Sequence, residues 1–463
     1  MIRPKYLRVV LILCILACLL VGCHQEVPET TPPVTEPPIA PLEQYNQARL
    51  PVDQSENLIL SYSIAETRTV GANTLPRTVT GTASYSKVGK KDMMAVVEES
   101  LRYGTYTTTY TEAYCDRLAY AVVNGCYFSS DMKVDAFLDR QIPAVLITGD
   151  LYGAVTREYT GNTILLTFSQ PKSLESWVTA EKASLISATG TATLDTAGNL
   201  MQTGYHAEYQ VGDVSYILDL SVRVTTPKNL DLSAKHPAHD ADCVSLKSLD
   251  ALKHLLQAAG DVYAAQTITS QLEETILSDA IPLTYVQTSQ MSLSGFDTGL
   301  LFHAQYNATL SDYRGEVTSK TQVDKFENDL FTSQVNDGEP KPQTWVTAKQ
   351  MRRQAEDKLL SSLMAVKYLA GATLTDEGDT IRLAFEGNDD FCTDLTKTLS
   401  DFLQVDLDAA AEAVQTELAG GYLVIDKDSG LPVEMGIQMN KIHTINTVVY
   451  ALTHTLQQNL QFA

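Results

Sequence analysis

Alternation of apolar and polar side chains is the feature that most restricts the fold of this chain. In Val214–Val224 every even-numbered position is apolar and most odd positions are polar, and Leu58–Ile64 alternates in the same way. A period of two with one polar face is typical of a strand in an antiparallel sheet that is covered on one side only. The chain is therefore expected to form sheets whose apolar faces need a cover.

The same series of segments occurs twice. Thr111–Gly125 and Gln322–Gly338 each place an aromatic strand before a turn of the Asn-Gly or Asn-Asp-Gly type, which is a strong hairpin signal. Further on, Gly161–Phe168 and Gly378–Phe385 are identical at five of eight positions. Self-similarity in a constant order predicts one structural unit written twice.

A turn between strands follows in each copy, over Leu194–Met201 in the first and Ile425–Pro432 in the second. Asn199 falls opposite Gly430, and both residue types accept the left-handed conformation that such a turn needs. We therefore expect a long hairpin near the end of each copy.

Two helical stretches are expected in each copy. They span Val134–Leu151 and about Leu174–Ile186 in the first, and Ala348–Leu369 and Leu395–Leu418 in the second. Because they have no other apolar partner, these helices would pack on the apolar face of each sheet. The sequence thus predicts two α+β units in tandem. The expected division is residues 1–22 as a leader, 23–41 as a tether, 42–227 as the first unit, 228–244 as a linker and 245–463 as the second unit.

The N-terminus has the pattern of a secretory signal. Residues 1–8 carry three positive charges and no acid, and Val9–Val21 is apolar but shorter than the roughly 20 residues of a membrane-spanning helix. Gln25–Pro41 is rich in proline, which forbids a helix and predicts an extended tether.

The end of the apolar run, Leu20-Val21-Gly22-Cys23, resembles the bacterial lipobox. In that family the cysteine receives a diacylglyceryl group and a peptidase cuts just before it. The resemblance implies that Leu20, Val21 and Gly22 are the recognition residues and that Cys23 is lipidated. Two acyl chains make membrane residence lasting, so we expect a protein anchored at the extracytoplasmic face of the cell membrane.

Charge and cysteine usage exclude other classes. Loss of residues 1–22 takes the formal charge from −22 to −25, and a chain this acidic is not expected to bind nucleic acid. Cys115, Cys126, Cys243 and Cys392 are too scattered for a disulfide framework. Cys115 and Cys126 are expected to flank one strand at opposite ends, so a bridge between them is not expected.

The order of strands, helices and long hairpins behind a lipobox and tether resembles bacterial lipoproteins of the LolA/LolB and mycobacterial lipid-carrier type. Leu423–Val433 is the most recognisable local piece. The resemblance implies two tandem curved antiparallel β-sheets (half-barrels), each with helices on its concave face. It also implies an apolar cavity between sheet and helices that holds acyl chains. No motif defines ligand residues in that family, so none are carried over.

Several short segments contain residues typical of metal-binding or catalytic sites, but a structural role is the favoured interpretation of each. Asp426–Gly430 begins like a calcium loop, but the twelfth position is Ile437 rather than an acid, so a hairpin turn is expected. Lys235–Cys243 has residue types that bind zinc, but it lies in the linker, where a solvated segment is favoured. Ser84 and Ser169 begin SxxK motifs without the companion motifs of penicillin-recognising enzymes. We expect no enzyme, no cofactor and no metal site.

Two functions remain open. The first is binding of a lipid or other apolar ligand in a cavity of a few hundred Å³ or more with few polar groups. The second is a non-enzymatic surface module that binds a protein or cell-wall partner through an exposed aromatic patch.

Overall fold

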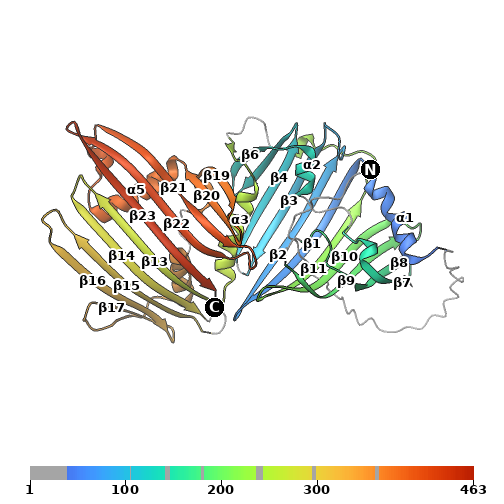
Figure 1. The fold of residues 1–463 in the computed structure, drawn as a ribbon, viewed down its shortest axis with the longest axis horizontal. Helices are drawn as coiled ribbons and strands as arrows, with labels where there is room; N and C mark the ends of the chain where they lie inside the picture. The colour runs from blue at the N-terminus through green and yellow to red at the C-terminus, as the bar shows by residue number, and fades with distance from the viewer. Residues whose placement is uncertain are drawn as a thin grey trace.

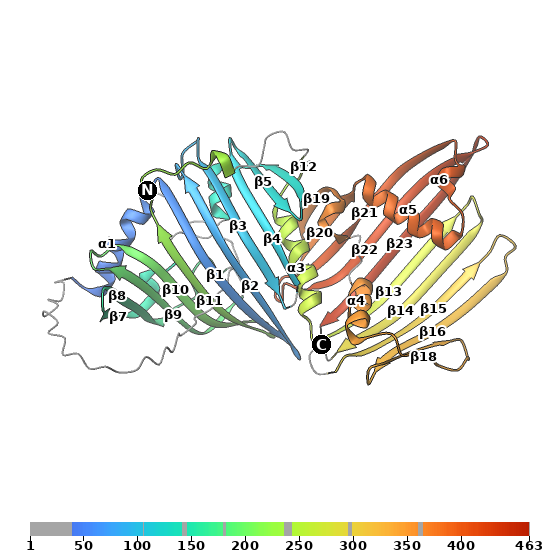
Figure 2. The same cartoon turned by 180° about the vertical axis from the view of Figure 1, so that it is seen from behind.

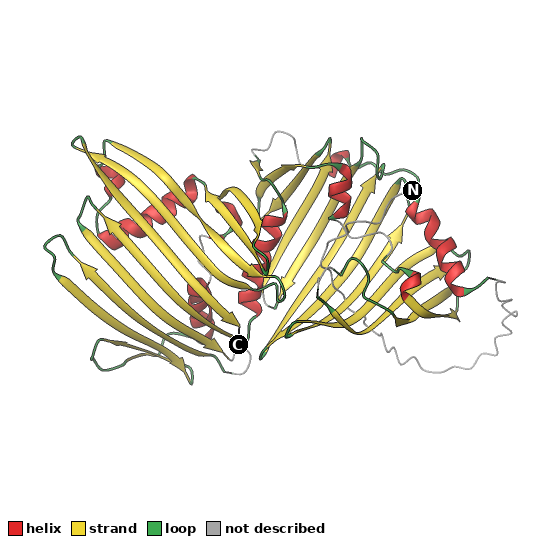
Figure 3. Cartoon of the chain, viewed as in Figure 1, coloured by secondary structure: helices red, strands yellow, loops and turns green. Residues whose placement is uncertain are grey.

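The computed structural model describes residues 39–104, 106–140, 146–178, 182–235, 243–294, 299–359 and 364–462. The expected leader, the lipobox with Cys23, most of the tether, and residues 236–242 of the linker lie outside these ranges. The fold class is confirmed: the described chain forms two large curved antiparallel sheets in tandem, neither of which closes on itself (Figures 1 and 3). No described helix is long and apolar enough to cross a membrane.

The first sheet has the strand order β12-β6-β5-β4-β3-β2-β1-β11-β10-β9-β8-β7, and all pairings are antiparallel except that of β12 with β6. Its strands are β1 (Asn57–Val70), β2 (Asn73–Ser86), β3 (Met94–Tyr103), β4 (Tyr106–Cys115), β5 (Leu118–Val123), β6 (Cys126–Asp131), β7 (Tyr152–Thr160), β8 (Thr163–Pro171), β9 (Ser184–Asp195), β10 (Leu200–Val211), β11 (Val214–Thr225) and β12 (Val244–Ser245).

The second sheet has the order β18-β17-β16-β15-β14-β13-β23-β22-β21-β20-β19. Its strands are β13 (Thr267–Ser278), β14 (Leu283–Ser294), β15 (Leu301–Ser311), β16 (Val317–Glu327), β17 (Leu330–Val335), β18 (Lys341–Gln343), β19 (Leu369–Asp376), β20 (Thr380–Gly387), β21 (Ala413–Asp426), β22 (Pro432–Ile445) and β23 (Val448–Phe462).

The two sheets have the same connectivity. Replacing β1 to β11 in order by β13 to β23 converts the first strand order into the second, with β12 as the extra strand. The five-of-eight sequence match lies on equivalent strands, β8 and β20, and on the turns before them. The duplication inferred from short sequence matches therefore extends to every strand of the second sheet.

The helices differ in part from the expectation. They are α1 (Pro41–Asp53), α2 (Val134–Asp139), α3 (Asp250–Ala264), α4 (Ala348–Leu359), α5 (Asp389–Leu403) and α6 (Leu407–Ala410), with short 3-10 turns at Gly149–Leu151, Ser233–Lys235 and Val366–Tyr368. The helix expected near Leu174–Ile186 is wrong: 174–178 is not helical and β9 begins at Ser184. Leu174, Trp177 and Val178 have the spacing of a helix face, but this spacing also occurs in the irregular segment found here.

Two other boundaries are corrected. The last helical stretch ends at Ala410 rather than Leu418, because β21 begins at Ala413. In the β9–β10 turn, Gly198 (φ +86°) rather than Asn199 adopts the left-handed conformation, whereas Gly430 (φ +68°) adopts it as expected. Asn199 instead donates its backbone and side-chain N–H groups to Asp195 at 2.8 Å.

Helix α3 lies between the two sheets (Figures 1 and 2) and packs on β2, β3 and β4 of the first sheet. It also touches α4 and β19 of the second sheet. Gly260 allows the closest approach, since a Cβ there would lie 2.2 Å from Cγ of Tyr103. The helix that precedes the second sheet in the chain thus covers the first.

Candidate functional site

The second sheet carries a cavity of about 800 Å³ on the face that α4 and α5 partly cover. Figure 2 shows both helices on this side of the sheet. The lining comes from β13 to β16, β23 and the two helices: Leu272, Glu274, Tyr285, Gln287, Ser289, Met291, Tyr306, Ala308, Leu310, Thr318, Lys320, Gln322, Lys358, Thr398, Phe402, Leu456 and Gln458. We call this the second-unit cavity. The resemblance implied a cavity in this position, between sheet and helices.

Strand register explains why these side chains share one face. Leu272, Ser289 and Tyr306 form one row across β13, β14 and β15, because Leu272 pairs with Ser289 and Ser289 with Tyr306. Tyr285 and Leu310 pair four residues further along, on the same face. Side chains at alternate positions of a strand point to the same side of the sheet.

The lining is more polar than the expected apolar cavity. Apolar surface comes from Leu272, Leu310, Leu456 and the ring of Phe402, which packs on Tyr285 with centroids 4.6 Å apart. Each strand of the lining also carries at least one polar residue on this face, so charged and amide groups lie among the apolar ones. The cavity is amphipathic, and the expectation of few polar groups is wrong.

In the second-unit cavity the acidic group has an oppositely charged or basic partner, but the lysines have no acidic one among the described residues. His454 contacts Glu274 through Nε2 at 2.9 Å. Lys358 donates from Nζ to the hydroxyl of Tyr306, and the ammonium lies 4.6 Å from the centre of that ring. Burial lowers the pKa of Lys358, and Asp324 nearby opposes that shift. The one carboxylate of the lining, Glu274, thus has His454 as a partner, whereas neither lining lysine, Lys320 or Lys358, forms an ion pair with a described side chain.

The equivalent face of the first sheet is filled. Helix α3 lies over β2, β3 and β4, the strands equivalent to β14, β15 and β16 that line the second-unit cavity. Leu252, Leu255 and Leu256 of α3 are buried there. Nearer the other edge, Tyr45 packs edge-on against Phe168 at 4.9 Å. The same place in the fold is occupied by a helix in one unit and open in the other.

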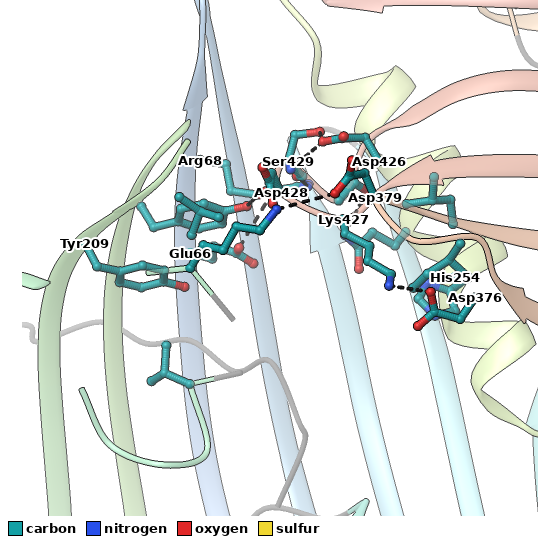
Figure 4. A pocket seen from close by; sticks show the side chains of 18 of the residues that line it. Glu66, Arg68, Tyr209, His254, Asp376, Asp379, Asp426, Lys427, Asp428 and Ser429 are labelled. Carbon is teal, nitrogen blue, oxygen red and sulfur yellow. Dashed lines mark hydrogen bonds and ion pairs between the residues drawn. The ribbon is translucent and has the colours of Figure 1, made fainter. Parts of the chain in front are cut away.

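A second cavity, of about 510 Å³, lies where the two units meet (Figure 4). The first unit contributes Glu66, Arg68 and Tyr209, and the turn between β21 and β22 contributes Asp426 to Gly430. Figure 4 shows Arg68 beside Ser429 and Asp428 of that turn. We call it the junction cavity.

Hydrogen bonds from the first unit and α3 hold the β21–β22 turn. Arg68 donates from Nη1 to the carbonyl oxygen of Ser429 at 2.6 Å, and Tyr216 donates its hydroxyl to the carbonyl oxygen of Asp428 at 2.5 Å. Gln257 of α3 donates to the carbonyl oxygen of Gly430 at 3.4 Å. The side chain of Asp426 shapes the turn by accepting from Ser429 N at 2.7 Å. The hairpin reading of this segment is confirmed, and the turn also joins the units.

Arg68 is the centre of a buried ion-pair network. It is 1% exposed, pairs with Asp261 of α3, and lies 3.7 Å from Glu66, which is also 3.5 Å from Arg77. Burial raises the pKa of Asp261 to about 6 against the opposing pull of Arg68 and Arg77. Burial opposes the charge of Arg68, but Asp261 and Glu66 outweigh it and raise the pKa of Arg68. Two arginines and two carboxylates compensate one another, which assigns this network a role in joining the units.

The other candidate residues from the sequence, two serines and two cysteines, lie in strands or at strand ends and form no site in the described part of the chain. Ser84 lies within β2, and Ser169 lies within β8. Cys115 and Cys126 flank β5 at opposite ends, and the described cysteines are free. Within the described ranges no group of three or more His, Cys, Asp or Glu side chains is placed to hold a metal. The sequence interpretation missed the second-unit lysines and Arg68, because single charges on a strand or a helix give no local signal.

Comparison with known proteins does not assign a family. Neither a protein-family model nor a curated protein sequence matches the chain. LprF from Mycobacterium bovis is similar at 11% identity over 46% of this chain and 92% of its own, with a TM-score of 0.28. A putative AttH from Nitrosomonas europaea is similar at 8% identity over 87% of this chain and 92% of its own, with a TM-score of 0.12. TM-scores this low carry no functional assignment.

Replacing Arg68 by Met should destabilise the protein by about 3–5 kcal/mol, because Asp261 and Glu66 would stay buried without their main counter-charge. Urea unfolding followed by circular dichroism measures the change. Arg102→Met, at an exposed arginine of β3, is the control and should change stability by less than about 0.5 kcal/mol. Equal effects of the two substitutions would contradict the importance of the network.

Asp261 should make stability depend on pH. Its folded-state pKa of about 6 exceeds the usual 3.8, so the folded protein binds this proton more tightly than the unfolded chain. The stability that this group contributes is complete below about pH 4 and is lost as the pH rises through about 6. The free energy of unfolding of the native protein relative to Asp261→Asn should therefore rise between about pH 7 and pH 5.

Asp195→Asn is the control for this pH series. Hydrogen bonds from the Asn199 side chain and backbone lower the pKa of Asp195, so its own titration lies below the range tested. Its difference from the native protein should stay constant between about pH 7 and pH 5. A constant difference for Asp261→Asn as well would refute the raised pKa.

Proposed function

We propose that this protein is an exported, lipid-anchored binding protein whose second unit holds an amphiphilic ligand with an apolar chain. The anchor would be the lipid on Cys23, placed by the Leu20–Cys23 sequence at the extracytoplasmic face of the membrane. The proline-rich tether would separate the folded units from the lipid surface. No enzymatic role is proposed.

One observation carries the ligand proposal: the two units share a fold, but a helix covers the face in the first that lies open in the second. In the first unit α3 removes the apolar face of β2 to β4 from water. In the second unit Tyr285, Tyr306 and Leu310 on the equivalent strands are only half-buried. Exposed apolar surface in a cavity is the usual mark of a ligand site.

The size and composition of the cavity favour an amphiphile over a purely apolar molecule. About 800 Å³ is within the range of cavities that bind small molecules. Each buried methylene of an acyl chain contributes about 0.8 kcal/mol, so leucine and aromatic side chains supply affinity. The amides and ammonium groups of the same lining need a polar partner when water leaves.

Filling the second-unit cavity should abolish ligand binding. In Ala308→Trp the indole would project into the lining, whereas in the control Asn307→Trp it would project from the opposite face of β15, where Asn307 is exposed. The test is native mass spectrometry of the chain from His24 onward, purified without detergent and incubated with bacterial membrane lipids. The native chain and the control should carry a lipid adduct, and the Ala308→Trp variant should not. A bare protein mass for all three would refute the proposal.

A second candidate function has its own support in α3. An amphipathic helix already occupies the equivalent face of the first unit, so a helix from a protein partner would suit the second. A fluorescent peptide with the α3 sequence, residues 250–264, is a direct probe. Peptide binding that Ala308→Trp blocks, with no lipid adduct in the native protein, would favour the helix partner over the amphiphile.

Membrane attachment should depend on Cys23. Cys23→Ser removes the thiol that would accept the diacylglyceryl group, so the protein should move from the membrane fraction to the soluble extracytoplasmic fraction. Cys126→Ser, at a free cysteine of β6, is the control and should leave attachment unchanged. Membrane retention of Cys23→Ser would contradict the anchor.

A further inference from the structure

We infer that the ligand of the second-unit cavity carries an anionic head group, held between Lys320 of β16 and Lys358 of α4. This inference rests on the proposed function and narrows it to anionic amphiphiles. It comes from the balance of charge in the lining.

The two lysines approach the cavity from different elements. Lys320 lies on β16, where it pairs with Ala308 in the middle of the lining. Lys358 lies near the end of α4, across from the sheet, and its ammonium donates to the hydroxyl of Tyr306 on β15. Sheet and helix therefore each present one ammonium to the same space.

The two carboxylates near the lysines already accept hydrogen bonds from other side chains. Glu274 is in contact with His454 at 2.9 Å. Asp324, the acid that acts on Lys358 from a distance, accepts from Ser333 Oγ at 2.7 Å and from Gln322 Nε2 at 3.0 Å. Neither lysine forms an ion pair with a described side chain, although acids outnumber bases by 56 to 34 in the sequence.

Partial loss of water favours an anion at Lys358. The residue is exposed at the surface, but its pKa is lowered because packing removes part of the water around the ammonium and Asp324 offsets this only in part. An anionic oxygen near the ammonium would restore a charge-assisted hydrogen bond, which is about twice as strong as a neutral one. The phenol of Tyr306 would supply a further hydrogen bond to the same group. A zwitterionic or uncharged head group would restore less of the lost solvation.

The order of the lining fits a head and a chain. Tyr285, Leu310 and Phe402 cluster around the ends of β14 and β15 nearest the β13–β14 hairpin, and the ring of Phe402 packs against that of Tyr285 at a tilt. Lys358 reaches Tyr306, four residues from Leu310 along β15. At about 3.4 Å per residue this separation is about 14 Å, so an acyl chain lying along β15 would place its head at the lysines.

Three probes with one acyl chain and different head groups test this inference: lysophosphatidylglycerol, lysophosphatidylcholine and monoacylglycerol. Each is titrated below its critical micelle concentration into the chain from His24 onward, with binding measured by native mass spectrometry. The anionic lysophosphatidylglycerol should bind at least about tenfold more tightly than the other two, equivalent to about 1.4 kcal/mol. Raising the ionic strength should reduce the preference.

Lys320→Gln and Lys358→Gln should each reduce this preference and leave binding of monoacylglycerol unchanged. Lys325→Gln is the matched control, because Lys325 lies on the opposite face of the same strand β16 and is exposed. Since Lys320 is exposed and has no described side-chain partner, its substitution should leave the fold intact even if Lys358→Gln destabilises it.

The outcomes separate the two claims. Equal affinity of the native protein for all three probes would refute the anionic head group and leave the amphiphile proposal in place. Binding of none of them, with no adduct from membrane lipids, would refute the proposed function itself. A preference for the anionic probe that survives in both Lys320→Gln and Lys358→Gln would refute the assignment to these lysines.

Discussion

Each sheet of this protein has one apolar face that must be removed from water, and most of the architecture follows from how that is done. Antiparallel strands with alternating side chains form readily, but a single layer is stable only with a partner on its apolar face. The first sheet is covered by α1, α2 and α3 and by large aromatic side chains such as Tyr45 and Phe168. The second has α4 and α5 and retains a cavity.

Helix α3 connects this constraint to the assembly of the two units. It precedes β13 in the chain, as α1 precedes β1, yet it packs on the first sheet. The apolar core is continuous across the two units as a result. Arg68 and Asp261 meet under this helix, and the β21–β22 turn accepts a hydrogen bond from Arg68. A buried ion pair adds little net stability compared with apolar packing, but it penalises arrangements that leave either charge alone. The network therefore favours one relative placement of the sheets.

The sequence was sufficient for the sheets because their information is local and repetitive. The alternation in Val214–Val224 identified β11 directly, and the turn residues around Gly430 located the β21–β22 hairpin. Helices were less well predicted, since the segment near Leu174–Ile186 has apolar residues at helical spacing although 174–178 is not helical. The residues that line the cavities could not be predicted from the sequence, because Leu310, Phe402 and Lys358 are far apart in the chain. Only the pairing of β14, β15 and β16 and the placement of α4 and α5 bring them together.

Duplication followed by divergence gives a physical reason for one filled face and one open face. Two copies of a unit start with two equivalent faces, and one helix can cover only one of them. In this chain the helix that begins the second copy, α3, covers the face of the first copy, and Gly260 lets it approach the ring of Tyr103. The first copy gains a closed core and a fixed junction, which relieves the second of the need to be fully packed. Its half-buried Tyr285, Tyr306 and Leu310 are tolerable because the rest of the molecule supplies the stability. This open apolar face is the feature on which the proposal of a ligand for the second unit rests.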